Sequence, residues 1–174
     1  MSVILDKAGL ARMIVRLSHE IEERNEGTEG VCLLGIKRGG EAVARRVAEA
    51  FAARGVFVPY AGISIGMHRD DLVTSYFIPE AEKNEIGFSV EGKRVVLCDD
   101  VLHTGRSVCA AIDAIFELGR PACVQLLELI DRGGRELPVR ADYVGKNVPM
   151  SRSEFLDVGF AELGGDDTVV IRKR

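Results

Sequence analysis

Two neighbouring acids followed by a short polar turn are the residues of this chain most suited to chemistry. Asp99 and Asp100 end a run of aliphatic residues, and the turn formed by residues 104–107, Thr-Gly-Arg-Ser, comes soon after them. Backbone N–H groups and hydroxyls at the start of a helix form a natural site for one phosphate group. Carboxylates beside that site accept hydrogen bonds from hydroxyl groups. The pattern therefore predicts a ligand that carries both hydroxyls and a phosphate.

Each part of this pattern has a simpler interpretation when it is taken alone. Two acids after a strand are also typical of a metal site or an acidic pocket, and a Thr-Gly turn is also a common helix cap. The order of the parts favours the ligand site. An aliphatic run, then acids, then a turn before residues with helical spacing places all of them at the carboxyl edge of a parallel sheet, where ligands bind.

A second loop rich in glycines and cations lies upstream. Lys37, Arg38, Gly39 and Gly40 follow a predicted strand at residues 31–36 and precede a predicted helix. Glycine lets a backbone approach a ligand closely, and the two cations attract a polyanion. A solvated basic turn is the alternative interpretation of this loop on its own.

The elements around these loops indicate an α/β fold. Apolar residues at helical spacing predict helices over residues 7–25, 41–53 and 108–115, and buried aliphatic runs predict strands at residues 31–36, 56–65, 95–98 and 124–130. Their alternation predicts a mainly parallel sheet flanked by helices. The tail, residues 158–174, is expected to form one weaker edge strand or two, with a strand at residues 169–171 and a turn at residues 164–167.

Residues 67–91 show no clean periodicity and are either a functional flap or a mobile surface hairpin. A flap would exclude water from a reactive sugar centre. Further along, residues 132–152 contain five basic residues against two acidic ones, so a negatively charged partner is expected there. A subunit interface or a solvated face is the alternative.

Length and composition predict one soluble domain spanning residues 1–174. The chain has 47% hydrophobic and 29% charged residues, and no apolar run approaches the roughly 18 residues that cross a membrane. No signal peptide is visible at the start, so a cytoplasmic location and no membrane partner are expected. The four cysteines form no CxxC pair and are predicted to be reduced core thiols. A formal net charge of −4 argues against non-specific binding of nucleic acid.

The strand, acid pair and Thr-Gly turn resemble the signature of type I phosphoribosyltransferases, which bind 5-phosphoribosyl-1-pyrophosphate (PRPP). The resemblance implies their fold, with a flexible flap and a small hood beside the sheet. It also implies that Asp99 and Asp100 are catalytic acids that hold the ribose hydroxyls and Mg²⁺, the metal contact being largely through ligand and water. Lys37 and Arg38 are the other implied catalytic residues and hold pyrophosphate. The implied PRPP and nucleotide contacts are Gly39, Gly40, Val101, Leu102, His103, Thr104, Gly105, Arg106 and Ser107.

The whole chain is similar to one family within this group, whose members are uracil phosphoribosyltransferases that also regulate pyrimidine-biosynthesis (pyr) genes. The matches are residues 17–25, 35–37, 69–72 and, most specific, the block at 131–149. This resemblance implies that uracil and PRPP react to give UMP and pyrophosphate. It also implies that uridine nucleotides (UMP or UTP) promote binding to the pyr mRNA leader, and that the chain forms a homo-oligomer, a dimer or higher.

The family resemblance assigns further residues. Tyr143 and Val144 would contact the base, and Arg69, Asp70 and Asp71 would belong to the flap. The implied RNA contacts are Arg16, His19, Arg24, Arg135, Arg140 and Lys146. Two other functions stay open: a phosphoribosyltransferase without RNA regulation, and a nucleotide-sensing RNA-binding regulator with vestigial catalysis.

This sequence departs from the family pattern at a few positions. Val15 stands where the family commonly has Thr, and Gly134 where it commonly has His, so a hydroxyl and an imidazole are missing from the implied RNA contacts. His103 replaces a Tyr in the PRPP motif. The loop Lys-Arg-Gly-Gly replaces the usual Lys-Thr-Arg-Gly, which moves the arginine by one position.

Overall fold

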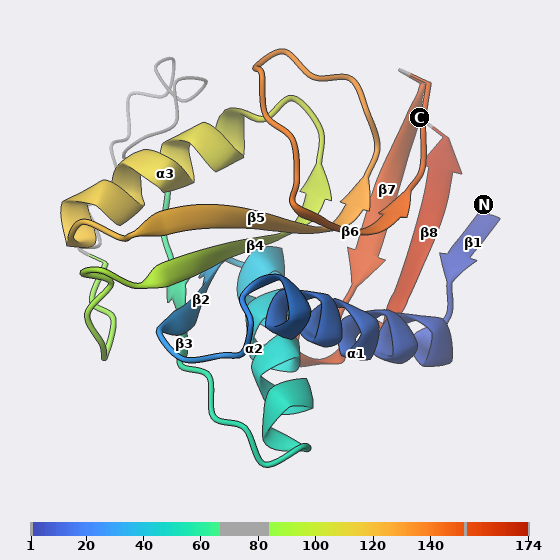
Figure 1. Ribbon diagram of the computed structural model, residues 1–174. Helices are drawn as coiled ribbons and strands as arrows, with labels where there is room; N and C mark the ends of the chain where they lie inside the picture. The colour runs from blue at the N-terminus through green and yellow to red at the C-terminus, as the bar shows by residue number, and fades with distance from the viewer. Residues whose placement is uncertain (1, 67–83, 152, 174) are drawn as a thin grey trace.

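A five-stranded parallel sheet forms the centre of the computed structural model, which describes residues 2–66, 84–151 and 153–173. The strand order is β3-β2-β4-β5-β6, and every neighbouring pair is parallel (Figure 1). The strands are β2 (Val31–Ile36), β3 (Tyr60–Ile63), β4 (Arg94–Leu102), β5 (Cys123–Asp131) and β6 (Tyr143–Asn147). The type I phosphoribosyltransferase arrangement predicted from the sequence, an α/β fold with a parallel sheet, is confirmed.

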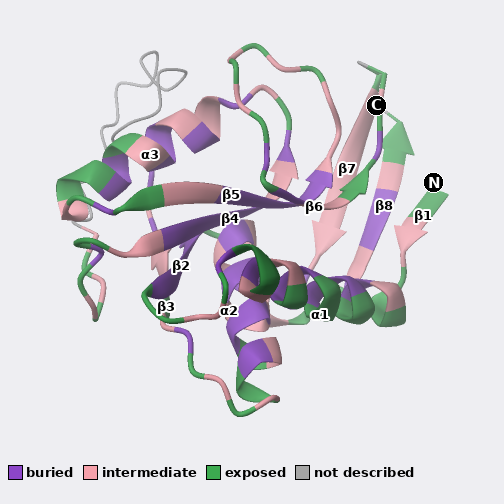
Figure 2. Ribbon diagram, in the orientation of Figure 1, coloured by how far each residue is buried: buried purple, intermediate pink, exposed green. Residues whose placement is uncertain are grey.

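Helices cover both faces of this sheet. Helices α1 (Lys7–Arg24) and α2 (Gly39–Ala52) pack with one face, and α3 (Arg106–Leu118) packs with the other. Successive residues along β2 alternate between the two cores, so Leu33 belongs to the α1–α2 side and Leu34 to the α3 side. Burial on both faces explains why β2 is buried along its whole length and reads as a continuous aliphatic run (Figure 2).

A smaller antiparallel sheet lies beside the main one, at the place of the hood implied by the resemblance (Figure 1). Its strand order is β1-β8-β7, and its bounds are β1 (Ser2–Leu5), β7 (Glu154–Gly159) and β8 (Thr168–Lys173). The chain ends therefore meet in one sheet, because β1 and β8 are neighbours. Leu156 and Val158 of β7 pack against the α1–α2 core, which joins the two sheets.

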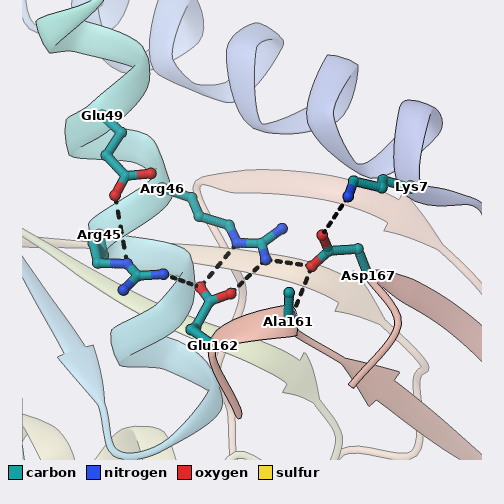
Figure 3. Close-up of polar contacts among 7 residues, drawn as sticks. All are labelled: Lys7, Arg45, Arg46, Glu49, Ala161, Glu162 and Asp167. Atoms are coloured by element: carbon teal, nitrogen blue, oxygen red, sulfur yellow. Dashed lines mark hydrogen bonds and ion pairs between the residues drawn. The ribbon is translucent and has the colours of Figure 1, made fainter. Parts of the chain in front are cut away.

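Buried ion pairs fix the smaller sheet to α2 (Figure 3). The Arg46 guanidinium donates from Nε to the Glu162 carboxylate at 3.0 Å, and it also donates to Asp167. Glu162 lies in the short helix η2 (Ala161–Leu163), and Asp167 comes just before β8. Arg45 adds a 2.7 Å ion pair to Glu162, and Asp167 Oδ1 accepts from the backbone N–H of Ala161 at 2.9 Å. The Arg46 guanidinium lowers the pKa of Glu162.

The predicted elements are mostly confirmed, with a few corrections. The structure contains β1 and β6, which the sequence did not predict; β7 lies mostly before residue 158, where the predicted tail begins, and β3 is shorter than the predicted strand. Cys32 and Cys98 are buried free thiols as expected, whereas Cys109 is half-buried and Cys123 is exposed, so the prediction of core thiols is wrong for these two. Within the described residues, no helix combines the length and apolarity that a membrane span requires.

Candidate functional site

Asp99 and Asp100 lie at the carboxyl end of β4, in the middle of the main sheet. Asp99 is 9% exposed, and its Oδ1 accepts a hydrogen bond from the backbone N–H of Asp100 at 3.0 Å. No ion pair reaches either carboxylate from the part of the chain that the structure describes. Two adjacent acids are therefore held at low exposure, with no ion pair to a cation among the described residues.

The environment makes both acids reluctant to ionise. Burial raises the pKa of Asp99 well above its ordinary value, and the neighbouring charge of Asp100 raises it further. Burial also raises the pKa of Asp100, although the hydrogen bond with the Asp99 side chain opposes this shift. A bound cation, or hydroxyl groups that donate hydrogen bonds, would favour the charged forms. The pair is suited to a ligand that brings one or both.

Two helix N-termini flank this acid pair. Helix α2 begins after Lys37 and Arg38, and helix α3 begins after Gly105. In neither helix does the N-cap residue, Arg38 or Gly105, supply a side-chain cap, and at the start of α3 the Arg106 N–H makes only a long 3.4 Å hydrogen bond to Thr104 Oγ1. Such N-termini favour anions through their free donors and the helix dipole. The site thus offers an anion position on each side of the acids.

The two glycines that begin α2, Gly39 and Gly40, are required by close packing against β4. A Cβ atom on Gly40 would lie 2.2 Å from the backbone oxygen of Cys98, and one on Gly39 would lie 2.5 Å from the Asp100 carboxyl. The loop therefore runs directly over the acid pair. Lys37 and Arg38 are exposed next to it, and the peptide bond between them is cis. The structure brings the predicted pyrophosphate loop and the predicted diol acids together.

The turn at residues 104–107 is held from outside by the loop that follows β5. Thr104 O accepts from the backbone N–H groups of Glu136 and Leu137, each at 3.0 Å. Gly105 has a φ of +91°, a left-handed conformation that favours glycine, and the Val139 side chain packs against it. The Arg106 guanidinium donates to Glu136 Oε2 at 2.8 Å. Val101 and Ser107 are half-buried and Leu102 is buried in this turn region.

Arg135 acts as a clamp on the same turn. Its guanidinium donates to the carbonyl oxygens of His103 at 3.0 Å and Val139 at 3.0 Å, and it pairs with the Asp131 carboxylate. With these partners, and with its side chain 24% exposed, it is committed to the protein itself. The sequence reading assigned Arg135 to RNA binding. In the structure it holds the backbone around the turn at residues 104–107, through His103 O and Val139 O.

Two departures from the family pattern meet in space. A Cβ atom on Gly134 would lie 3.1 Å from Cδ2 and Nε2 of the His103 ring. The His103 imidazole therefore packs against Gly134, the position where the family commonly has His. His103 is exposed, and partial burial together with Arg132 and Arg135 lowers its pKa. The His103 imidazole lies at the outer side of the turn.

Glu128 is an acid at the site that the sequence reading missed. It lies in β5 directly opposite Asp99, it is fully buried, and neither carboxyl oxygen has a partner within the described chain. Burial raises its pKa well above the ordinary value, and Asp99 and Asp100 raise it further. The available signal was a single acid inside the aliphatic run of residues 126–130.

The prediction that Tyr143 contacts the base is not supported by its position. Its side chain is 2% exposed and packs in the α1–α2 core, and its hydroxyl donates to Gln125 Oε1 at 2.8 Å. A ring enclosed in this way offers no face on which a base could stack. Val144 is the next residue of β6, half-buried and in register with Glu128, and it packs against the α3-side core.

Four of the predicted RNA contacts lie along α1 and β6, which pack together. Arg16 Nη2 donates to Gly145 O at 2.6 Å, and Arg24 pairs with Asp142 at 2.7 Å and lies 5.6 Å from the Tyr143 ring centroid. His19 is exposed on the same helix, and Lys146 is exposed on β6. Arg140 is exposed just before β6. These five residues, Arg16, His19, Arg24, Arg140 and Lys146, are called the basic strip below.

The predicted flap residues Arg69, Asp70 and Asp71 lie outside the described residues. Ser64 and Asn84, which lie on either side of that segment, are joined by two hydrogen bonds of the Asn84 side-chain amide. Asn84 Oδ1 accepts from Ser64 N at 2.6 Å, and Asn84 Nδ2 donates to Ser64 O at 2.9 Å. Residues 64 and 84 are thereby held together next to the end of β3.

The two acids of the site fit Mg²⁺ only where water and ligand oxygens supply most of its coordination. No group of three or more His, Cys, Asp or Glu side chains in the described part of the chain forms a metal cage. Mg²⁺ commonly keeps several waters and binds through one or two carboxylates plus substrate oxygens. Asp99 and Asp100 provide carboxylates of that kind beside two anion positions. They fit an ion that arrives with a phosphorylated ligand.

The chain shares its fold with known phosphoribosyltransferases. A hypoxanthine phosphoribosyltransferase of Trypanosoma cruzi superposes with a TM-score of 0.73 at 19% sequence identity, covering 99% of this chain and 97% of that one. A hypoxanthine-guanine phosphoribosyltransferase from Bacillus anthracis gives a TM-score of 0.63 at 19% identity, covering 86% and 82%. At these identities the likeness concerns the fold alone.

Sequence relatives are much closer. A bifunctional protein PyrR from Pelotomaculum thermopropionicum is 52% identical over 169 residues, covering 97% of this chain and 93% of the relative. Another PyrR, from Geobacter sulfurreducens, is 49% identical and covers 99% and 98%. The phosphoribosyl transferase domain family matches residues 2–158. Together with the acid pair between two open helix starts, these matches show that the chain belongs to the phosphoribosyltransferase family and, within it, to the PyrR proteins.

Proposed function

We propose that residues 1–174 act in the cytoplasm as one phosphoribosyltransferase domain that converts uracil and PRPP to UMP and pyrophosphate. The observation that carries this proposal is the acid pair, buried at Asp99 and half-buried at Asp100, between two helix N-termini whose N-cap residues supply no side-chain cap. PRPP is a sugar diol with a phosphate at one end and a pyrophosphate at the other. Its three polar parts match the acids and the two helix starts in number, order and charge.

Each group of residues then has a role in the transfer. Asp99 and Asp100 accept hydrogen bonds from the ribose hydroxyls. The turn from Thr104 to Ser107 takes the 5-phosphate, and the loop of Lys37 and Arg38 takes the pyrophosphate. The bond from the sugar to pyrophosphate breaks as the bond to the uracil nitrogen forms, and positive charge develops on the ribosyl centre. The nearby carboxylates stabilise that charge, so catalysis depends on positioning and electrostatics.

A Mg²⁺ ion held at Asp99 and Asp100, largely through substrate oxygens and water, would neutralise charge on the departing pyrophosphate. The chain's own contribution is to hold two carboxylates close together at low exposure, which costs energy until a cation or hydroxyl donors arrive. This cost is visible in the raised pKa values of both acids. Binding of the magnesium–PRPP complex relieves it.

Conversion of radiolabelled uracil to UMP tests the enzyme proposal. The purified chain with PRPP and Mg²⁺ should form labelled UMP, and Asp100→Asn should reduce the rate strongly. Absence of turnover with uracil and with every other pyrimidine or purine base would reject the enzyme function and leave a nucleotide-sensing regulator.

A second function, binding of pyr mRNA, is favoured by the basic strip. Arg140 and Lys146 are exposed, and no hydrogen bond or ion pair joins either side chain to another described residue. The strip is a local positive surface on a protein with a net charge of −4, which fits specific rather than general attraction to RNA phosphates. UMP or UTP bound at the phosphate turn would promote this binding.

Filter binding tests the RNA function. The pyr leader transcript of the source strain should be retained in the presence of UMP, and Arg140→Gln should weaken retention. Equal affinity for a scrambled hairpin at physiological salt would reject specific RNA binding and leave an enzyme without RNA regulation.

A homo-oligomer is also part of the proposal. Phe57 is 86% exposed and Tyr60 is 42% exposed, and both lie at or just before β3, which forms one edge of the main sheet. Large exposed apolar side chains beside an edge strand fit a contact between subunits. Light scattering of the wild type and of Phe57→Ser measures this directly.

A further inference from the structure

The end of α2 touches the basic strip through one arginine that the family resemblance does not assign. Arg54 follows the last turn of α2, and its guanidinium crosses to α1. There it donates to Ser18 Oγ at 2.8 Å and to Glu22 Oε2 at 2.9 Å, and its Nη1 lies 3.2 Å from His19 Nε2. The Arg54 side chain is only 26% exposed, and its guanidinium lies 5.1 Å from the Phe51 ring centroid. Arg54 is therefore held in place on several sides.

The contact with His19 determines where the imidazole carries its proton. A guanidinium has only donors and stays charged in proteins, so His19 Nε2 must be the acceptor in this pair. An imidazole nitrogen that accepts a hydrogen bond carries no proton. In the neutral ring the proton is then on Nδ1, which has no hydrogen-bond partner in the described part of the chain.

We propose that Arg54 is a positioning residue for RNA binding: it locks His19 as the Nδ1–H tautomer, so that the ring presents one donor to an acceptor atom of the RNA. This inference rests on the proposed binding of pyr mRNA. It concerns a hydrogen bond rather than a phosphate charge, because the locked His19 ring is neutral. Val15 has no hydroxyl to donate on this face of α1. The Nδ1–H group of His19 is then the neutral side-chain donor that this face offers to RNA.

The surroundings of Arg54 support a positioning role over a direct contact. Glu22 takes up part of its charge, and Ser18, which it also contacts, is fully buried and donates to Val15 O at 2.7 Å. A guanidinium with three protein partners has little capacity left for a phosphate. Its effect on RNA therefore passes through His19.

Nuclear magnetic resonance of the RNA-free protein tests the tautomer. Long-range ¹H–¹⁵N spectra at neutral pH distinguish the protonated ring nitrogen of His19 from the unprotonated one. We expect Nδ1 to be protonated in the wild type and the two tautomers to mix in Arg54→Met, which keeps an unbranched side chain but removes the guanidinium. A wild-type His19 that is protonated on Nε2 would overturn the proposal, whatever the RNA result.

A double-mutant cycle with the pyr leader transcript tests the consequence. Arg54→Met should weaken binding roughly three- to tenfold, the range expected for one hydrogen bond, and Arg54→Lys should restore part of it. In a His19→Ala background, Arg54→Met should have no further effect. Arg172→Met is the matched control, because it removes one cation that pairs with Asp157 on the smaller sheet.

Each other outcome has a defined meaning. Unchanged binding in Arg54→Met, or an equal loss in the His19→Ala background, would overturn the positioning role. If the Arg54→Met protein does not fold, the wild-type spectrum and RNA binding by Arg54→Lys test the positioning role instead. If the wild type itself does not prefer the leader to a scrambled hairpin, the proposed RNA function fails, and the spectrum still decides whether Arg54 sets the tautomer.

Discussion

Glu128 lies directly opposite Asp99 in the parallel pairing of β4 and β5, fully buried and with both carboxyl oxygens lacking a partner in the described chain. Burial and the charges of Asp99 and Asp100 raise the pKa of Glu128 in the folded protein above its ordinary value. This relationship connects the stability of the fold to the charge of the site.

Replacing Glu128 should make the protein more stable at neutral pH. Its pKa is raised in the folded state, so its contribution to stability is present below the ordinary value of 4.5 and is lost as the pH rises toward the folded-state value. Glu128→Leu removes this loss and the unsatisfied oxygens, and should raise the free energy of unfolding at pH 8 by about 1–3 kcal/mol. Urea titrations at pH 5 and pH 8 measure the difference, which should be larger at pH 8. Glu49→Gln, an exposed helical acid, is the control, and a difference that shrinks as the pH rises would contradict the prediction.

Replacing an acid of the central pair should change activity and stability in opposite directions. Asp100→Asn removes a charged acceptor for the ribose diol, so kcat/KM for PRPP should fall roughly 10- to 150-fold. It also removes the repulsion with Asp99 that raises the pKa of that neighbour, so the melting temperature should rise. Steady-state kinetics and thermal unfolding of the same preparation check both. A loss of activity together with a loss of stability would indicate a structural role instead.

Gly39 and Gly40 should respond differently to the same substitution. An alanine Cβ at position 40 meets the backbone oxygen of Cys98 at 2.2 Å, so Gly40→Ala should destabilise the fold by about 1–3 kcal/mol. At position 39 the Cβ meets the Asp100 carboxyl, a side chain that can rotate away. Gly39→Ala should therefore raise the KM for PRPP with little change in the melting temperature. Equal loss of stability in both variants would be inconsistent with this packing.

Arg135 and Arg140 should separate the two proposed functions. Arg135 clamps the phosphate turn through carbonyl oxygens of His103 and Val139, so Arg135→Met should weaken PRPP binding as well as RNA binding. Arg140 is exposed and has no proposed role at the turn, so Arg140→Gln should weaken RNA binding and leave PRPP binding unchanged. Uracil phosphoribosylation and filter retention, measured side by side, check this. If the Arg135→Met enzyme has a normal KM for PRPP, its role in the turn is contradicted and a direct RNA contact is favoured.

The elements of the main sheet were predictable because their local patterns and their burial agree. Strand β2 is buried on both faces, so its residues had to be aliphatic throughout, and the predicted bounds match. The acids and the turn could be found for a similar reason, since a parallel strand delivers its last residues to the ligand edge of the sheet. Short strands such as β6 and β7 were missed. They carry polar residues on partly exposed positions and form only because a neighbouring strand supplies the hydrogen bonds.

By itself, the sequence determined the kind of ligand proposed for this protein, because acids, glycines and hydroxyls in a fixed order around a strand and a helix start allow few alternatives. Only the tertiary structure decided which side chains are available to that ligand. Tyr143 is closed inside the core, Arg135 is used by the turn, and Glu128 is brought beside Asp99. Exposure and pairing of this kind depend on residues far apart in the chain, which no local pattern records.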